Sequence, residues 1–358
     1  MSAPIIPLKN NLDFLRFIAA SAVLYSHSYP LYGYGKPDLF VRLTGHLDTL
    51  GGFSVSIFFI ISGFLITASW QRKPDLIQYF KNRLLRIIPA LFVVVILTIF
   101  VLGPLVTQLS VQEYFSSSAT YKYFLNAGML TVSTQLPGVF VDNPIALVVN
   151  GSLWTLPVEF FMYMVVAFLG VLGLISKKTL PYILLITLFV FMHMVHSKMH
   201  IMGGSIPVYY AAKHAISFIS GMLIFIYFKN ISFSFHWFIF FLAATLIALH
   251  TKYAVTVIMI TLPYMVIFLA FSNLGKIHNF GKYGDFSYGL YIYAFPVQQL
   301  CAQYFKGENM FIYYMFACYA ITFLLAFLSW HLVEKHALKL KYTPLRKWCS
   351  IRGGRATN

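Results

Sequence analysis

Apolar residues form long unbroken runs along most of the chain, and short polar connections separate these runs. The strands of a membrane β-barrel would instead alternate apolar and polar positions. A helix needs roughly 20 mostly apolar residues to cross a bilayer. Ten runs come close to that length or exceed it: 12–29, 52–70, 87–108, 152–174, 180–197, 208–228, 233–250, 254–272, 286–305 and 310–333. The pattern therefore predicts an all-α, polytopic membrane protein with about ten transmembrane helices.

The composition indicates the same class. Of the 358 residues, 59% are hydrophobic and 10% are charged, whereas a soluble domain is about 45–50% apolar and about 25% charged. An ordinary soluble enzyme is excluded, because too few charged residues are present to cover its surface. The three cysteines have no C-x-x-C spacing, so we expect neither a disulfide framework nor a metal site.

Positive charge is divided unevenly between alternate connections. The chain has 26 Lys and Arg against 10 Asp and Glu, a net charge of +16. Eighteen of the basic residues fall on one predicted side and six on the other, while Arg16 and Lys213 lie within runs. The positive-inside rule assigns the richer side to the cytoplasm. Both termini are then cytoplasmic. This charge is explained by topology and by contact with anionic lipid, and we expect no nucleic-acid partner.

One membrane domain fills residues 1–340, and residues 341–358 form a basic cytoplasmic tail. The longest connection, 109–151, falls on the outer side and includes a serine-rich stretch, Ser116-Ser117-Ser118. A connection of this length is typically functional or contains short helices of its own.

Glu159 is the acidic residue that lies well inside an apolar run. It is roughly 10 Å below the outer end of the run, at 1.5 Å per residue. Pro157, two residues earlier, predicts a broken or kinked helix. An ionisable group at membrane depth is costly and is a functional candidate by default. The structural alternative is a glutamate hydrogen-bonded to neighbouring helices.

Arg16 and His27 share one face of the first predicted helix, because eleven residues complete three turns to within about 20°. Their axial separation of about 16 Å places Arg16 near the cytoplasmic face and His27 toward the outer half of the bilayer. Glu159 reaches a depth similar to that of His27, which permits a His–carboxylate pair for proton transfer near neutral pH. The alternatives are an interfacial histidine and a membrane-edge arginine.

Arg83 and Arg86 are three residues apart at the cytoplasmic entrance of the third run. They share a helix face, where two guanidinium forks suit a phosphate better than a point charge does. Positive-inside topology is the alternative explanation. Ser62-Gly63, in the middle of the second run, indicates close packing between helices.

Six motifs resemble the membrane acyltransferase-3 family. The spacing from Arg16 to His27 is similar to its Arg-x10-His signature. The other five are Phe58–Leu65 (FFIISGFL), Arg83–Pro89 (RLLRIIP), Ser152–Glu159 (SLWTLPVE), Phe286–Tyr291 (FSYGLY) and Trp330–Glu334 (WHLVE). The likeness covers about residues 11–340. It departs from the family at Ala294, near which many members have a second histidine, and in lacking the SGNH-type domain that is fused to some members.

The resemblance implies acyl transfer, usually of acetyl from cytosolic acetyl-CoA to a hydroxyl of a surface glycan. Similar stand-alone bacterial members act on O-antigen, exopolysaccharide or capsule. The expected setting is the outer face of the bacterial inner membrane, with the lipid bilayer and a surface glycan or its lipid-linked precursor as partners. The missing SGNH-type domain leaves room for a separate periplasmic partner.

Roles follow from this resemblance and from the residue chemistry. We expect His27, oriented by Glu159, to deprotonate the acceptor hydroxyl, and Arg83 and Arg86 to hold the phosphates of acetyl-CoA. Arg16 is a further clamp or lines the path of the donor. Four residues are unranked candidates for oxyanion or substrate contacts: Ser62, Trp154, Tyr288 and Tyr291. Direct transfer and an acetyl-His27 intermediate both stay open.

Two functions without acyl transfer also fit the apolar pattern. A proton-coupled transporter or flippase of a glycan or small metabolite would explain the buried ionisable residues, although no inverted repeat is visible. A scaffold in an envelope complex is the third alternative, and buried ionisable residues argue against it.

Overall fold

The computed structural model describes residues 7, 9–45, 47–129, 131–196, 202–203, 206–249, 251 and 253–342. Within these residues the fold is a bundle of helices, and the two strands, β1 (Met202–Gly203) and β2 (Ile206–Pro207), form one short antiparallel pair. Most of the predicted tail, 343–358, lies outside the described residues.

Each of the ten predicted runs coincides with a helix. These are α1 (Leu12–Tyr32), α3 (Leu50–Arg72), α4 (Leu76–Leu97), α8 (Thr155–Val171), α9 (Leu180–His196), α10 (Val208–Ile226), α11 (Phe235–Ala248), α12 (Ala254–Phe271), α13 (Ser287–Tyr304) and α14 (Phe311–Ser329).

Six helices in the described part of the chain are long and apolar enough to cross a membrane. They are Leu50–Arg72, Leu76–Val106, Gly151–Val171, Val208–Ile226, Ala254–Phe271 and Glu308–Tyr342. The helices α9 and α11 are apolar but shorter, and α1 and α13 contain more polar side chains. The chain is therefore a multi-pass membrane protein, while ten spans and the cytoplasmic termini stay predictions.

Two of the long helices continue through wider π-helical turns. The helix α4 leads through η1 (Thr98–Leu102) into α5 (Gly103–Val106), and α14 leads through η6 (Trp330–Glu334) into α15 (Lys335–Lys339) and the short turn η7 (Leu340–Tyr342). Single π-helical turns inside α-helices are frequent at functional sites. The second of these turns contains Glu334, which enters the ion-pair network described below.

The connections contain short helices, as expected for 109–151. That connection folds into α6 (Val111–Ser116), α7 (Ser118–Lys122) and η2 (Tyr123–Gly128), and the other short elements are α2 (Leu39–Leu43), η3 (Gly151–Trp154), η4 (Gly275–Tyr283) and η5 (Glu308–Met310). A capping box between Ser110 and Glu113 starts α6, and Tyr114 and Tyr123 of this connection are fully buried.

The predicted break near Pro157 is absent: the backbone stays helical at Trp154 and Thr155, and Gly151–Val171 forms one continuous apolar helix. The turn η3 ends at Trp154 and α8 begins at Thr155. Pro157 is the third residue of α8, in the first turn, where its missing N–H costs no intrahelical hydrogen bond. Glu159 follows one half-turn later.

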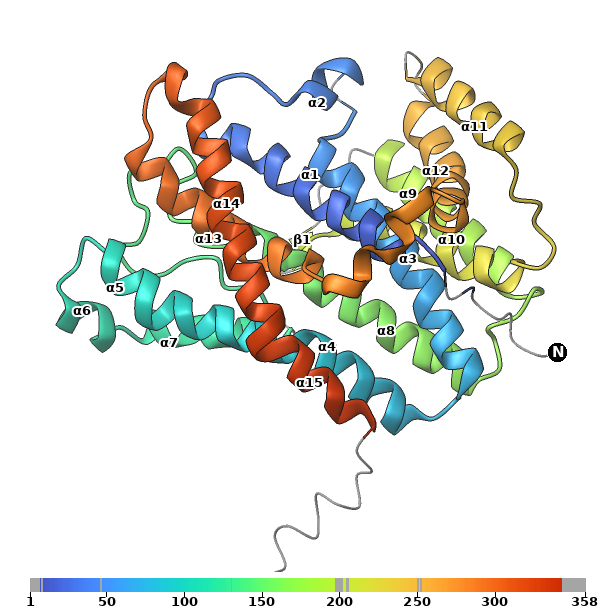
Figure 1. Cartoon of the computed structure of the whole chain (residues 1–358), viewed down its shortest axis with the longest axis horizontal. Helices are drawn as coiled ribbons and strands as arrows, with labels where there is room; N and C mark the ends of the chain where they lie inside the picture. Colours follow the sequence, from blue (N-terminus) through green and yellow to red (C-terminus); the bar gives the residue numbers. More distant parts are fainter. Residues whose placement is uncertain are drawn as a thin grey trace, which may run out of the picture.

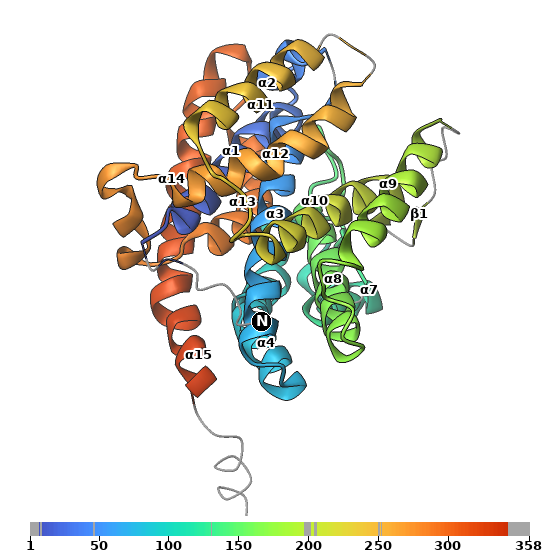
Figure 2. The same cartoon turned by 90° about the vertical axis from the view of Figure 1, so that its right-hand side faces the viewer.

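The helices α1, α3, α10 and α13 form the centre of the bundle (Figure 1). The helices α3 and α10 approach closely because Gly63 and Gly221 have no Cβ atom at their contact. A Cβ atom at Gly63 would lie 2.0 Å from the Phe218 carbonyl oxygen, and one at Gly221 would lie 2.1 Å from the Ile60 carbonyl oxygen. The close packing expected at Ser62-Gly63 is thus confirmed. In both views, α2 lies at one end of the molecule and α15 at the other (Figures 1 and 2).

Candidate active site

Two adjoining cavities contain most of the residues that the sequence predicted. The large cavity has a volume of about 470 Å³ and is lined by His27 and Trp154. The small cavity, of about 50 Å³, is lined by Arg16 and Glu159. Tyr291 lines both cavities, as does Val55, so these two side chains lie at the boundary.

The small cavity brings together five predicted residues from four helices. They are Arg16 of α1, Ser62 of α3, Glu159 of α8, and Tyr288 and Tyr291 of α13. No local pattern in the sequence connects these residues, because they lie up to 275 positions apart along the chain. Helix packing alone makes them neighbours.

Glu159 is hydrogen-bonded inside the protein, as the structural alternative anticipated. Its carboxylate accepts hydrogen bonds from Ser62 Oγ at 2.8 Å and from Tyr163 Oη at 2.5 Å. Within the described residues no hydrogen bond joins Glu159 to His27. The predicted His–carboxylate pair is therefore wrong, because similar depth in the bundle does not place two side chains in the same cavity.

His27 faces the large cavity from α1. Its ring packs edge-to-face on Phe295, with 5.6 Å between ring centroids, and its Nδ1 is buried without a hydrogen-bond partner in the described part of the structure. Glu159 therefore does not orient the His27 ring in this structure. The role of His27 as a base stays a prediction.

An ion-pair network lies at the opposite end of α1 from His27. Asp285 Oδ2 is 2.9 Å from Arg16 Nη1 and 2.5 Å from Arg86 Nη2, and Arg86 Nη1 is 3.2 Å from Glu334 Oε2. Ser287 Oγ donates to the other Asp285 oxygen at 2.5 Å. We call these four charged residues, Arg16, Arg86, Asp285 and Glu334, the ion-pair network.

Burial and charge act in opposite directions on Asp285. Burial by itself raises the pKa of this carboxyl, but the guanidiniums of Arg16 and Arg86 and the hydrogen bonds from Ser287 outweigh burial and hold the pKa at about 2. Asp285 is therefore ionised throughout the neutral range. The sequence reasoning missed Asp285 and Glu334, since both lie outside the apolar interior of a run.

Arg83 and Arg86 do not act as a pair of forks in this structure. Arg86 is taken up by the ion-pair network, whereas Arg83 donates from Nη2 to Ser69 Oγ at 3.2 Å, and its buried Nε has no partner within the described residues. The pair that forms is instead Arg16 with Arg86, on opposite sides of Asp285. A phosphate-binding role for the three arginines stays a prediction.

Hydrogen bonds inside the protein occupy most of the candidate oxyanion donors. Tyr288 Oη donates to a backbone carbonyl of α4 at 3.0 Å, and Tyr291 Oη is 3.0 Å from the Ser152 carbonyl oxygen and 2.7 Å from Thr155 Oγ1. Ser62 is used by Glu159. Trp154 lines the large cavity and has no hydrogen bond to another described residue, which distinguishes it from the other three candidates.

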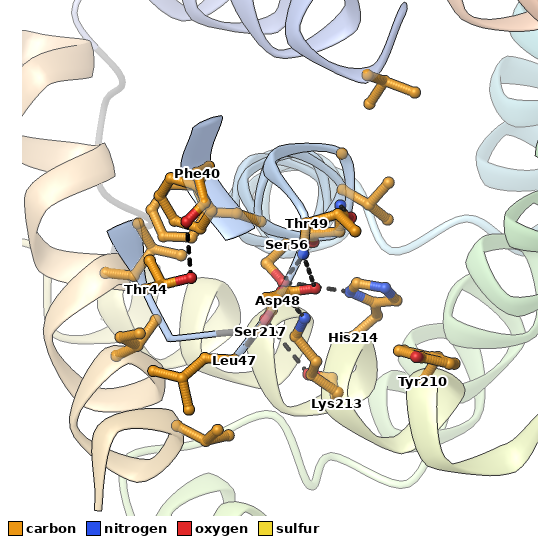
Figure 3. A pocket seen from close by; sticks show the side chains of 18 of the residues that line it. Phe40, Thr44, Leu47, Asp48, Thr49, Ser56, Tyr210, Lys213, His214 and Ser217 are labelled. Carbon is orange, nitrogen blue, oxygen red and sulfur yellow. Dashed lines mark hydrogen bonds and ion pairs between the residues drawn. The ribbon is translucent and has the colours of Figure 1, made fainter. Parts of the chain in front are cut away.

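The large cavity also contains polar groups that were not predicted as site residues. Lys213 of α10 forms an ion pair with Asp48, and His214 Nδ1 is 3.3 Å from Ser56 Oγ (Figure 3). A lysine inside an apolar run is itself a functional signal, and Lys213 in the run 208–228 carries that signal. The partner Asp48, 165 positions away, is visible only in the fold.

The chain is similar to known proteins along nearly its whole length. Residues 9–331 match the acyltransferase domain family. The O-acetyl transferase of Shigella phage Sf6 is 33% identical over 341 residues, which cover 92% of this chain and 96% of that protein. Nodulation protein 10 of Rhizobium leguminosarum bv. viciae is 34% identical over 167 residues, 44% of this chain and 42% of that protein. No solved structure matches the chain. The chain therefore belongs to the acyltransferase-3 family and is an acyltransferase.

Proposed function

We propose that the chain is an O-acetyltransferase of the bacterial inner membrane that moves acetyl from cytosolic acetyl-CoA to a hydroxyl of a cell-surface glycan. The acceptor is O-antigen, exopolysaccharide, capsule or a lipid-linked precursor, presented at the outer face. The phage relative, named an O-acetyl transferase, supports this activity. Family membership favours it over the transporter or flippase that the sequence left open.

The observation that carries the proposal is the pair of adjoining cavities. The small cavity includes Arg16, a member of the ion-pair network, and shares Tyr291 with the large cavity that contains His27. Arg16 and His27 are about 16 Å apart along α1. Coenzyme A is polyanionic at one end, and its pantetheine arm is slim and largely neutral. A donor held at the cytoplasmic end can thus extend its thioester toward His27.

The three arginines differ in which interactions each would lose on binding the donor's phosphates. Among the described residues, Arg83 donates one side-chain hydrogen bond, to Ser69, and its buried Nε has no partner, so it accepts a phosphate without losing an ion pair there. Arg16 and Arg86 would exchange carboxylate oxygens of Asp285 and Glu334 for phosphate oxygens. Glu159, on the wall of the small cavity, accepts hydrogen bonds from the amide groups of the pantetheine arm through its second carboxylate oxygen in this proposal.

In the large cavity, His27 takes the proton of the acceptor hydroxyl while the hydroxyl oxygen attacks the thioester carbonyl. The new C–O bond forms, the C–S bond breaks, and the proton passes from the imidazolium to the CoA thiolate. Trp154 donates a hydrogen bond to the oxyanion, because its indole N–H has no hydrogen-bond partner within the described residues. With an acetyl-His27 intermediate, the same overall transfer would take place in two steps, first to His27 and then to the acceptor hydroxyl.

The test uses membranes that contain the protein, acetyl-labelled acetyl-CoA and surface polysaccharide of the host cell. Base-labile label should enter the glycan with the wild type and with His236→Ala, an exposed histidine of α11, and should be lost with His27→Ala. Normal labelling by folded His27→Ala would refute the role of His27. No label with the wild type, once acceptor and protein are verified, would refute acetyl transfer to this glycan.

A further inference from the structure

The large cavity contains an ion pair, Asp48–Lys213, that the acetyl-transfer step itself does not use (Figure 3). Together with the rings of Tyr210 and His214, and with Trp154, which also lines this cavity, the pair forms a polar wall in the cavity that contains His27. The cavity volume of about 470 Å³ lies within the range of small-molecule sites, which are mostly apolar with a few placed polar groups. The question is which ligand such a wall recognises.

The ion pair is the principal charged feature of this wall. Asp48 and Lys213 are the only Asp, Glu, Lys or Arg residues among the described residues that line the cavity. Their side chains remain 20% and 12% exposed, so a ligand can reach them, and Asp48 Oδ1 also accepts the Thr49 backbone N–H at 2.9 Å. A carboxylate and an ammonium side by side offer acceptors and donors, but together no net charge.

The aromatic part of the wall is held in place by ring contacts. His214 is buried, stacks on Phe59 with 5.1 Å between ring centroids, and lies 5.8 Å from the Trp154 ring. The Ser56 hydroxyl lies 3.3 Å from its Nδ1, and the Tyr210 ring lies 6.2 Å from the Trp154 ring. Trp154 thus contacts two aromatic rings of the cavity lining.

We propose that this wall is a subsite for one neutral sugar unit of the acceptor, with Asp48 and Lys213 as the residues that select it. A pyranose ring has an apolar C–H face that packs on an aromatic ring, and its hydroxyls both donate and accept hydrogen bonds. Asp48 accepts from one hydroxyl, Lys213 donates to another, and Trp154 packs on the ring face. This inference rests on the proposed acetyl transfer to a glycan.

The charge balance favours a neutral unit over a uronic acid. A sugar carboxylate would have to compete with Asp48 for Lys213 and would leave two carboxylates beside one ammonium in a partly apolar cavity, which is costly. A neutral unit adds hydrogen bonds to the charged pair without breaking it. Hydrogen bonds to charged groups are roughly twice as strong as neutral ones, so the loss of either partner weakens acceptor binding markedly.

The experiment measures the KM for glycan and the KM for acetyl-CoA separately, with de-O-acetylated surface polysaccharide of the host cell as acceptor. Lys213→Met and Asp48→Asn should each raise the glycan KM at least about tenfold and leave the acetyl-CoA KM within about twofold. Lys306→Met, an exposed lysine outside both cavities, is the matched control and should change neither constant. An unchanged acetyl-CoA KM also shows that each variant is folded.

A charge-swapped double variant, Asp48→Lys with Lys213→Asp, separates recognition from a purely structural tie between α10 and the loop before α3. The swap restores an ion pair but exchanges the donor and acceptor positions. We expect the glycan KM to stay at least about tenfold above that of the wild type. A return to within about twofold of the wild-type value would overturn the subsite and leave only a structural tie.

Sugar charge is tested with oligosaccharides from partial acid hydrolysis of the same polysaccharide, separated by anion exchange into neutral and anionic fractions. The wild type should label the neutral fraction at least about ten times faster per oligosaccharide. Equal or faster labelling of the anionic fraction would overturn the inference. No label in any glycan would overturn the proposed function itself, whereas normal labelling with unchanged glycan KM in both single variants would overturn the subsite alone.

Discussion

Neutralising Asp285 should destabilise the protein, because Arg16 and Arg86 would each lose their ion pair with this carboxylate. In Asp285→Asn the 2.5 Å and 2.9 Å contacts to Arg86 and Arg16 lose their charge. The pKa of Asp285 lies at about 2, against an ordinary value of 3.8, and one pKa unit corresponds to about 1.4 kcal/mol. The charged form is thus stabilised by about 2 kcal/mol. Breaking a buried pair costs about 3–5 kcal/mol, so we expect a loss of about 2–4 kcal/mol.

The assay is equilibrium unfolding of the purified protein in mixed detergent and SDS micelles at pH 7, monitored by tryptophan fluorescence. Glu308→Gln is the matched control, because it neutralises an exposed carboxylate and should change the free energy of unfolding by less than about 0.5 kcal/mol. If Asp285→Asn is as stable as the wild type, the carboxylate does not hold the two arginines and the assignment of the ion-pair network is wrong.

The same pair of proteins gives a test of pH dependence. A carboxyl whose pKa is lower in the folded than in the unfolded protein contributes stability that is fully present above the unfolded value and is lost as the pH falls toward the folded value. The wild type should therefore lose about 2 kcal/mol between about pH 4.5 and pH 2 through Asp285. Asp285→Asn should lack that part of the loss. Parallel pH curves for the two proteins would contradict the depressed pKa.

Three further changes test the packing and the donor end. Gly63→Ala should prevent stable folding, because the new Cβ would lie 2.0 Å from the Phe218 carbonyl oxygen. The control Gly128→Ala, with open space around it, should be tolerated. A wild-type free energy of unfolding for Gly63→Ala in the same assay would refute the close approach of α3 and α10. Tyr288→Phe removes one buried hydrogen bond to α4 and should lower the free energy of unfolding by about 1 kcal/mol, and a neutral result would mean that the bond contributes no net stability. Arg83→Ala should raise the KM for acetyl-CoA about tenfold while changing stability by less than about 1 kcal/mol, because Arg83 has no carboxylate partner within the described residues; an unchanged KM would exclude it from donor binding.

The local pattern of the chain was sufficient to predict where the helices lie and which residues lie at the same end of the bundle. Each apolar run became a helix because its backbone groups are satisfied within the segment, and this needs no distant partner. The spacing of Arg16 and His27 likewise placed them at the two ends of one helix face, where the structure has the ion-pair network and the large cavity. Periodicity within one helix determines depth and face.

Tertiary structure alone decided which faces meet. Depth made Glu159 a plausible partner for His27, yet helix packing turned it toward Ser62 and Tyr163. Asp285 and Glu334 lie in a connection and at a helix end, and they gained importance only because packing brought Arg16 and Arg86 to them. Side chains far apart in sequence become neighbours through close helix contacts. The residues of a single run can indicate that a face packs closely, as Ser62-Gly63 did, but they do not specify which helix that face will meet.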